Sequence, residues 1–225
     1  MNSRTVTYDF EAIQDDELYR LADEHQKLIA LAEANSSLVQ VEVRDQHRLK
    51  PHPPTSYEIT YQLRSIIGVD ESEQPKYGNQ HKLLIRLPKE YPLGPADCKM
   101  ISDTWHPNIK SDGDFKGTIC TNHKGFGSLF YLDELVVRIG EFLQYKRYLA
   151  EDVKPYPEDQ KVARWVRNVA EPAGLVNRRE GKAIDDQIWA YVPPGIMDEE
   201  EDILFFDRAE DSPSEGDNLE DIQFL

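Results

Sequence analysis

The sequence contains only two cysteines among its 225 residues, Cys98 and Cys120. Two cysteines are too few for a disulfide framework in a chain of this size. The sequence also has no apolar run close to the roughly 18 residues that a membrane span requires. The N-terminal residues lack the basic patch and apolar stretch of a secretory signal. These absences predict a cytoplasmic protein that neither enters a membrane nor depends on disulfides.

Positive charge is scarce as well, with 26 Lys and Arg against 42 Asp and Glu, a net charge of −16. Such a balance argues against nucleic acid as a partner, because phosphates favour a basic surface. The imbalance is concentrated in residues 198–225, where twelve acids accompany only Arg208. We therefore expect one domain over residues 1–197 and an acidic, flexible tail over residues 198–225.

The acidic tail supports two interpretations. It can be a solvated segment that keeps the protein soluble. However, apolar residues are interleaved with the acids at 203–206 and 219–225, a pattern typical of segments that fold against a basic groove. A docking or autoinhibitory role of the tail therefore stands beside the simpler interpretation.

The hydrophobic periodicity predicts an α+β fold. A helix is expected over residues 15–34, with His25 as a packed residue on its apolar stripe. Alternating patterns predict strands, and the short connections between them favour an antiparallel meander of four strands. Helical spacing returns after Cys120. The expected strands cover residues 38–43, 57–67, 81–87 and 98–101, with a polar turn over 68–80, and the later helices cover 132–145, 158–169 and 185–191.

The stretch from Tyr91 to Cys120 carries the most specific information. It contains a tight turn, a short strand and then a long loop with little periodicity, in which Gly113 and Gly117 let the chain fold back. Ordering so much irregular chain inside a compact domain costs entropy, so loops of this kind are usually functional.

The residues of this stretch resemble the ubiquitin-conjugating (E2) family. A Tyr-Pro turn, a strand, His-Pro-Asn, Gly-x-Ile-Cys and an amphipathic helix follow one another as they do in that family. The resemblance extends over about residues 15–170, and the His-Pro-Asn and Gly-x-Ile-Cys motifs are its specific part. It implies the ubiquitin-conjugating (UBC-like) fold: an N-terminal helix, a four-stranded antiparallel meander and C-terminal helices. Within the family, the sequence is most similar to divergent bacterial E2-like proteins of ubiquitin-like conjugation operons with a role in antiphage defence.

The resemblance also implies roles for individual residues. Cys120 matches the cysteine that accepts a ubiquitin-like protein from an E1-like enzyme as a thioester, and a protein substrate is the final acceptor. Asn108 matches the residue that supports the active-site loop and stabilises the oxyanion. Asp152, or alternatively Glu151, is the nearest match to an acidic gate residue. No cofactor or metal is implied. The residues that match the structural part of the active-site loop are His106, Pro107, Tyr91 and Pro92.

Two departures from the family pattern bear on these roles. The loop between Asn108 and Cys120 is a few residues longer than in typical eukaryotic members, which puts the reach of Asn108 to the thioester in doubt. In addition, Ser128-Leu129-Phe130-Tyr131 replaces the Trp-Ser-Pro that usually follows the cysteine.

Several other interpretations compete with a catalytic thiol. A lone cysteine is usually a core residue, and this is the expectation for Cys98 in its strand. A metal site at His106, Cys120 and His123 lacks the spacing of known zinc motifs. A Cys/His hydrolase would need a remote orienting residue, which the sequence does not reveal. A non-catalytic module that binds a ubiquitin-like protein or a partner enzyme is the alternative from a different functional class.

Overall fold

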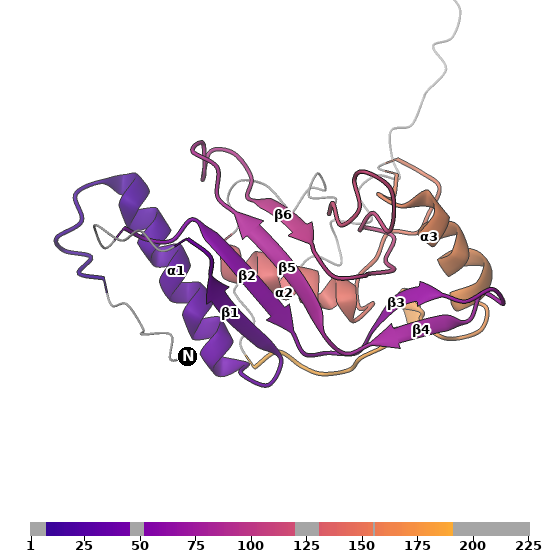
Figure 1. Cartoon of the computed structure of the whole chain (residues 1–225). Coiled ribbons are helices and arrows are strands. Elements are labelled where there is room, and N and C mark those ends of the chain that lie inside the picture. The colour runs from indigo at the N-terminus through magenta and orange to yellow at the C-terminus, as the bar shows by residue number, and fades with distance from the viewer. Residues whose placement is uncertain (1–7, 46–51, 120–130, 155, 191–225) are drawn as a thin grey trace, which may run out of the picture.

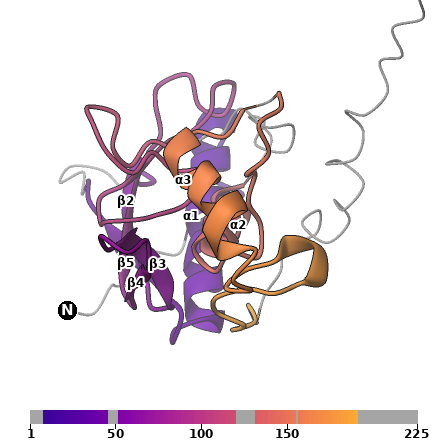
Figure 2. The same cartoon turned by 90° about the vertical axis from the view of Figure 1, so that its right-hand side faces the viewer.

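The structure is a computed structural model, and it describes residues 8–45, 52–119, 131–154 and 156–190. The predicted acidic tail lies outside these residues. A four-stranded antiparallel sheet forms the centre of the described chain, and helices α1 and α2 lie to one side of it (Figures 1 and 2). No helix among the described residues is both long and apolar enough to cross a bilayer.

Helix α1 (Asp16–Ala34) confirms the predicted N-terminal helix. Asp15 caps it by accepting hydrogen bonds from the backbone of Glu17 and Leu18, which satisfies N–H groups that the first turn leaves unpaired. The apolar stripe faces the sheet, and His25 packs within it, stacked on the ring of Tyr57. His25 is therefore a core residue, as the periodicity predicted.

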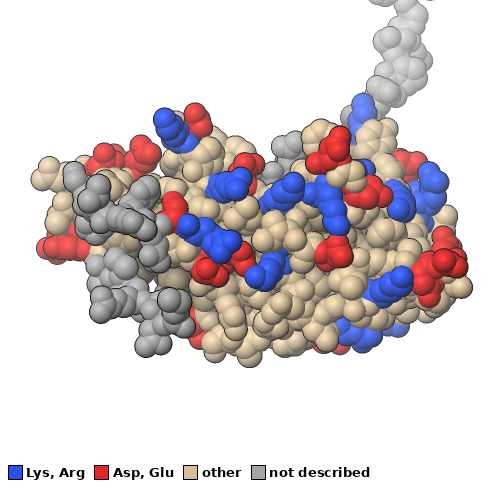
Figure 3. Space-filling model, in the orientation of Figure 1, with Lys and Arg blue, Asp and Glu red and all other residues tan. Residues whose placement is uncertain are grey.

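The main sheet has the order β1-β2-β5-β6, built from β1 (Val39–Val43), β2 (Ser56–Tyr61), β5 (His81–Arg86) and β6 (Asp97–Met100). All neighbouring strands are antiparallel, which confirms the four-stranded meander. The buried face of the sheet is mainly apolar, with His81 of β5 as a polar exception. On the opposite side, residues of both signs are interspersed (Figure 3), and Lys82 there covers the buried carboxylate of Glu58, with an ion pair of 2.6 Å.

One prediction for the sheet is wrong. The expected continuous strand over 57–67 ends at Tyr61, and the chain resumes as β3 (Ser65–Val69), which pairs with β4 (Pro75–Gly78) in a separate two-stranded sheet. The backbone N–H of Arg64 binds the Asp185 carboxylate at 2.9 Å instead of joining the ladder. The polar residues 68–80 therefore form most of a hairpin, whose exposed strand has no apolar alternation.

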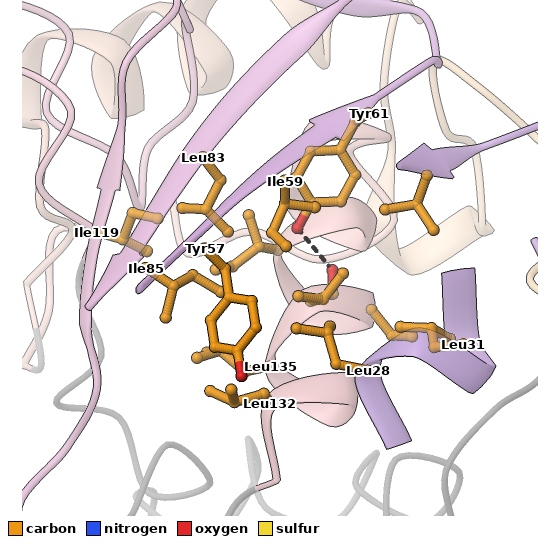
Figure 4. Close-up of a cluster of buried hydrophobic side chains, with 14 of the residues drawn as sticks. Leu28, Leu31, Tyr57, Ile59, Tyr61, Leu83, Ile85, Ile119, Leu132 and Leu135 are labelled. Carbon is orange, nitrogen blue, oxygen red and sulfur yellow. Dashed lines mark hydrogen bonds between the residues drawn. The ribbon is translucent and has the colours of Figure 1, made fainter. Parts of the chain in front are cut away.

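Helix α2 (Leu132–Leu143) packs beneath the sheet and closes the first of two hydrophobic clusters (Figure 4). Tyr61 is fully buried there and donates a hydrogen bond from its hydroxyl to the Val136 carbonyl at 2.9 Å. The helix ends two residues earlier than predicted, because Tyr145 adopts a left-handed conformation with φ of 60°.

The second hydrophobic cluster lies around α3 (Gln160–Trp165) and the π-helical turn Val166–Ala170 that continues it. These two elements confirm the helix that was expected over 158–169, with a start two residues later. Trp165 packs edge-on against Trp105 and donates a hydrogen bond to the Glu73 carbonyl at the tip of the β3–β4 hairpin. A short 3-10 turn (Arg178–Glu180) follows.

The predicted helix over 185–191 is wrong for its described part, since residues 185–190 are irregular. The Gln144 amide binds Asp185 and the carbonyl of Gln187, and Trp189 lies against Gly140 of α2. The segment, the last coloured part of the chain in Figure 1, reaches the end of α1, where Asn35 accepts a hydrogen bond from the Ala190 N–H. Side-chain contacts thus satisfy the backbone that a helix would otherwise pair internally. Residue 191 lies outside the described residues.

Candidate active site

Cys120 and His123 lie outside the described residues, but the chain leading to Cys120 is described as far as Ile119. Ile119 is buried and forms an antiparallel bridge with Ile109, and Thr118 forms another with Lys99 of β6. The backbone that immediately precedes Cys120 is therefore held between the sheet edge and the His-Pro-Asn segment.

His106 is fully buried, and both of its ring nitrogens form hydrogen bonds. Nδ1 accepts from the Asn108 N–H at 3.2 Å, so Nε2 is the nitrogen that donates to the Arg147 carbonyl at 3.1 Å. The ring also stacks on Phe142. Burial lowers the pKa of His106 to about 3, although the bond to Arg147 acts in the opposite direction, and the ring is neutral at physiological pH. His106 thus braces the turn.

Asn108 is 2% exposed, and its side chain is oriented by the chain that follows α2. Its Oδ1 accepts a hydrogen bond from the Leu149 N–H at 2.9 Å. This hydrogen bond identifies the side-chain atom of Asn108 near Leu149 as the acceptor Oδ1, so the donor Nδ2 is the other terminal atom of the amide. Pro107 is buried too, and its carbonyl accepts a hydrogen bond from the Asp159 N–H at 2.9 Å.

Asp159 is a residue of the site that the sequence analysis missed. It caps α3, and one of its oxygens accepts hydrogen bonds from both the N–H and the hydroxyl of Ser111. Burial acts to raise its pKa, but the hydrogen bonds from Ser111 and Val162 and the charge of Lys110 outweigh it, so the pKa lies below its usual value. An acid directly before a helix signals a cap, yet nothing local in the sequence links Asp159 to Ser111.

Residues 110–117 form the loop that is longer here than in typical eukaryotic members of the family. Contacts with β6, with the residues after it and with α3 hold this loop in place. Gly117 has a φ of 85°, and a Cβ there would lie 2.0 Å from the Met100 carbonyl oxygen, so only glycine fits. Ion pairs join Lys116 to Asp103 at 2.5 Å and Asp112 to Lys161 of α3 at 3.1 Å.

The Tyr91-Pro92 turn, whose peptide bond is cis, joins α1 and α2 through a buried carboxylate. Glu24 of α1 accepts hydrogen bonds from the Tyr91 hydroxyl and from Arg20, and its second oxygen accepts from the Leu132 N–H at 2.6 Å. Burial raises the pKa of Glu24, and these three partners offset only part of that effect.

The two gate candidates differ in their surroundings. Glu151 forms an ion pair with Arg178 at 3.0 Å and accepts a hydrogen bond from the Ala150 N–H. Asp152 is exposed, and it follows three residues after Leu149, the residue that contacts Asn108. Asp152 is therefore better placed than Glu151 to meet a partner from solution.

Cys98 is the other cysteine of the chain, and its surroundings show whether its thiol can act as a nucleophile. It lies on β6 against the first cluster, and burial, followed by the charge of Asp97, raises the pKa of its thiol to about 12. This thiol stays protonated and is a poor nucleophile. In the part of the chain that the structure describes, no three His, Cys, Asp or Glu side chains gather closely enough to hold a metal ion.

The family model for "Ubiquitin-conjugating enzyme" matches residues 39–153, a stretch that runs from β1 through the His-Pro-Asn turn and past Asp152. The chain belongs to the ubiquitin-conjugating enzyme family. The fold described above is therefore the UBC fold, with the sheet, α2 and the His-Pro-Asn loop all inside the matched region.

Parts of this chain are also similar to individual proteins and solved structures. "Ubiquitin-conjugating enzyme E2 K" from Homo sapiens and Bos taurus is 38% identical to this chain over 48 residues, a segment that spans 21% of this chain and 22% of theirs. A Toxoplasma gondii ubiquitin-conjugating enzyme E2 domain has 20% identity and a TM-score of 0.47, covering 74% of this chain and 96% of its own. For a Plasmodium yoelii putative ubiquitin-conjugating enzyme, the identity is 18%, the TM-score is 0.45 and the coverages are 68% and 86%. The predicted bacterial subgroup stays a prediction.

Proposed function

We propose that this chain acts as an E2-type conjugating enzyme, in which Cys120 accepts a ubiquitin-like protein from an E1-type enzyme and passes it to an amine of a target protein. The family match over residues 39–153 carries the proposal, because it covers Cys120 together with the His-Pro-Asn turn. The pairing of Ile119 with Ile109 supports it, since this bridge brings the residue before Cys120 beside the segment that contains Asn108.

The proposed reaction has two steps. The Cys120 thiolate attacks the carbonyl carbon of the thioester on E1, a new C–S bond forms and the E1 thiolate leaves. A target amine then attacks the same carbon, a C–N bond forms, the Cys120 thiolate leaves and the amine loses a proton to solvent or a base. A free cysteine with a pKa of about 8.5 is only a few per cent ionised at neutral pH, which suffices for exchange between thioesters.

The helper residues are assigned to the second step. Asn108 stabilises the oxyanion or supports the loop that forms around it, and removal of one oxyanion donor costs about 3 to 4 kcal/mol in enzymes that depend on it. Asp152 orients the incoming amine and eases its deprotonation. A lysine with a pKa near 10.4 is almost wholly protonated in water, so the second step is the one that needs such help.

The decisive experiment is a loading assay. The full chain is incubated with ubiquitin, the ubiquitin-activating enzyme and ATP, and in parallel with other ubiquitin-like proteins and their own activating enzymes. We expect a thiol-sensitive adduct for one of them that Cys120→Ala abolishes. Cys98→Ala is the matched control and should still load, because its thiol lies against the core. An adduct that survives Cys120→Ala would assign the thioester to another residue, and the absence of an adduct with every modifier would favour a non-catalytic binding module.

Loading and discharge then test the helpers separately. Asn108→Ala should slow discharge to free lysine far more than it slows loading. Asp152→Asn should do the same by a smaller factor. Equal slowing of both steps would remove these residues from the transfer reaction.

A further inference from the structure

Asp159 makes contacts on both sides of Asn108. Its backbone N–H donates to the Pro107 carbonyl at 2.9 Å, one residue before Asn108. Its Oδ2 accepts hydrogen bonds from the Ser111 N–H at 2.8 Å and from the Ser111 hydroxyl at 2.7 Å, three residues after Asn108. A single residue therefore fixes the two ends of the short segment that carries Asn108.

The remaining oxygen of Asp159 fixes the residue to a rigid element. Oδ1 accepts from the N–H groups of Lys161 and Val162, both at 3.0 Å, in the first turn of α3. Val162 is fully buried in the second hydrophobic cluster. The Asn108 segment is thus connected to a packed helix rather than to another surface loop.

The surroundings of Asp159 keep its carboxylate ionised. The side chain is nearly inaccessible, yet each oxygen accepts two hydrogen bonds, and charge-assisted bonds of this kind are strong. A neutral or shorter side chain would leave donors of Ser111 or of the first turn of α3 without this acceptor. The geometry of the loop therefore depends on this carboxylate and not merely on the volume of the side chain.

Asn108 itself is held from a third direction. The Leu149 N–H binds its Oδ1, and the neighbouring Arg147 carbonyl binds His106. The side chain can meet Leu149 in this way only while the backbone between Pro107 and Ser111 keeps its place. Asp159 contacts that backbone at Pro107 and at Ser111, and the pairing of residues 109 and 110 with residues 118 and 119 holds its middle.

We propose that Asp159 is a positioning residue for Asn108, which holds the 107–111 segment so that the Asn108 amide is presented to the transfer reaction. The proposal rests on the function proposed above, in which Asn108 acts in the discharge of Cys120. Asp159 does not touch the reacting atoms. Its effect on discharge passes through Asn108.

The test replaces Asp159 by Asn, which keeps the size of the side chain but supplies only one acceptor oxygen. Discharge of the thioester to free lysine should slow roughly 10- to 100-fold, as expected for a misplaced catalytic group. Loading of Cys120 should change by less than about twofold, because Asn108 is assigned to the later step. Both rates are measured in single turnovers at a temperature where the variant is folded.

Asp185→Asn is the matched control for a general loss of stability. Asp185 is also buried, and its carboxylate also accepts backbone N–H groups, those of Arg64 at 2.9 Å and Gln187 at 2.8 Å, but in the C-terminal segment. We expect this variant to load and discharge normally. Equal slowing of discharge by Asp159→Asn and Asp185→Asn would overturn the positioning role.

A double-mutant cycle supplies the readout that a purely structural role would not produce. In an Asn108→Ala background, Asp159→Asn should slow discharge no further than about twofold. The proposal would be overturned if the fold-changes of Asn108→Ala and Asp159→Asn in the discharge rate multiply in the double variant. Equal slowing of loading and discharge by Asp159→Asn alone would also overturn it. Ser111→Ala, which removes only the hydroxyl contact, repeats the test with less risk to folding. Failure of Cys120 to load at all would instead refute the proposed function.

Discussion

Two of the buried carboxylates on the elements around the candidate site, Glu24 and Asp159, are stabilised in opposite ways. Glu24, on the side formed by α1, the Tyr91-Pro92 turn and the start of α2, relies on Arg20 and the Tyr91 hydroxyl besides one backbone N–H. Asp159, on the side formed by the His-Pro-Asn segment and α3, receives three backbone N–H groups and a hydroxyl. Burial prevails at Glu24, whose pKa is raised, whereas hydrogen bonds prevail at Asp159, whose pKa is lowered.

The difference shows that two buried acids of similar exposure can change the stability of the protein with pH in opposite directions. Burial raises the pKa of Glu24 and so favours its neutral form, because its hydrogen-bond donors offset only part of the desolvation. Asp159 is favoured as an anion because backbone donors converge on it. Burial therefore determines the pKa shift on the Glu24 side of the site, and hydrogen bonds determine it on the Asp159 side. We expect a substitution of one carboxylate to leave the pKa shift of the other unchanged.

The largest predicted effect tests whether the two sides are also independent in packing. Trp165→Ala removes a buried indole from the second cluster and should cost about 3 to 5 kcal/mol of unfolding free energy. By amide hydrogen exchange, α3 and β3 should lose more protection than β2 and β5. The matched truncation in the first cluster, Trp189→Ala, should show the reverse pattern. Identical exchange profiles for the two variants would mean that the clusters form one cooperative unit.

The next effect concerns the close packing of the first cluster. A Cβ on Gly140 would lie 2.2 Å from the Trp189 ring, so Gly140→Ala should destabilise the protein by about 1 to 3 kcal/mol. In a Trp189→Ala background the clash disappears, and the same change should instead stabilise α2 by up to about 1 kcal/mol through helix propensity. Chemical denaturation of the four proteins measures this reversal. A loss of equal size in both backgrounds would contradict the packing explanation.

The smallest effect is the pH dependence of the two carboxylates, which should have opposite signs. The raised pKa of Glu24 gives a stabilising contribution that is complete below its ordinary value of 4.5 and is lost as pH rises through the folded pKa. The lowered pKa of Asp159 gives a contribution that is present above its ordinary value of 3.8 and is lost as pH falls through the folded pKa. The stability difference from wild type should therefore shrink with rising pH for Glu24→Gln and grow for Asp159→Asn.

Urea denaturation from about pH 3 to about pH 8 measures both slopes, neither of which can exceed about 1.4 kcal/mol per pH unit for one proton. The comparison is internal, since each variant serves as the control for the other. Slopes of the same sign would show that one carboxylate is in different surroundings from those described above.

Much of the fold could be predicted from periodicity, and the failures have local causes. Helices α1 and α2 each have one apolar stripe, so a helical period identifies them. Strand β4 is short, polar and exposed, which leaves no alternation to read. The segment 185–190 has residues suited to a short helix, but contacts of Gln144 and Trp189 with distant residues keep it irregular. Such tertiary contacts override local preference.

The candidate site was predictable only where a motif marks it. His106, Pro107 and Asn108 were identified by their order, and the structure shows them buried and joined to the chain after α2. Asp159 lies 48 residues after Ser111, a separation across which no periodic pattern connects two positions. Cys120 and the acidic tail 198–225 lie outside the residues that the structure describes. The thioester role of Cys120 and the docking of the tail therefore stay predictions.

The loop between Asn108 and Cys120 contains two glycines with positive φ whose tolerance of change differs sharply. Gly117 is enclosed by the Met100 carbonyl, whereas a Cβ at Gly113, with φ of 74°, would meet nothing within 4 Å. The positive φ of Gly113 still disfavours a side chain there, but neighbouring atoms do not, so we expect an insertion at Gly113 to be tolerated better than one at Gly117. Gly113 is therefore the place in this loop where a short epitope or a fluorophore-binding peptide could be grafted.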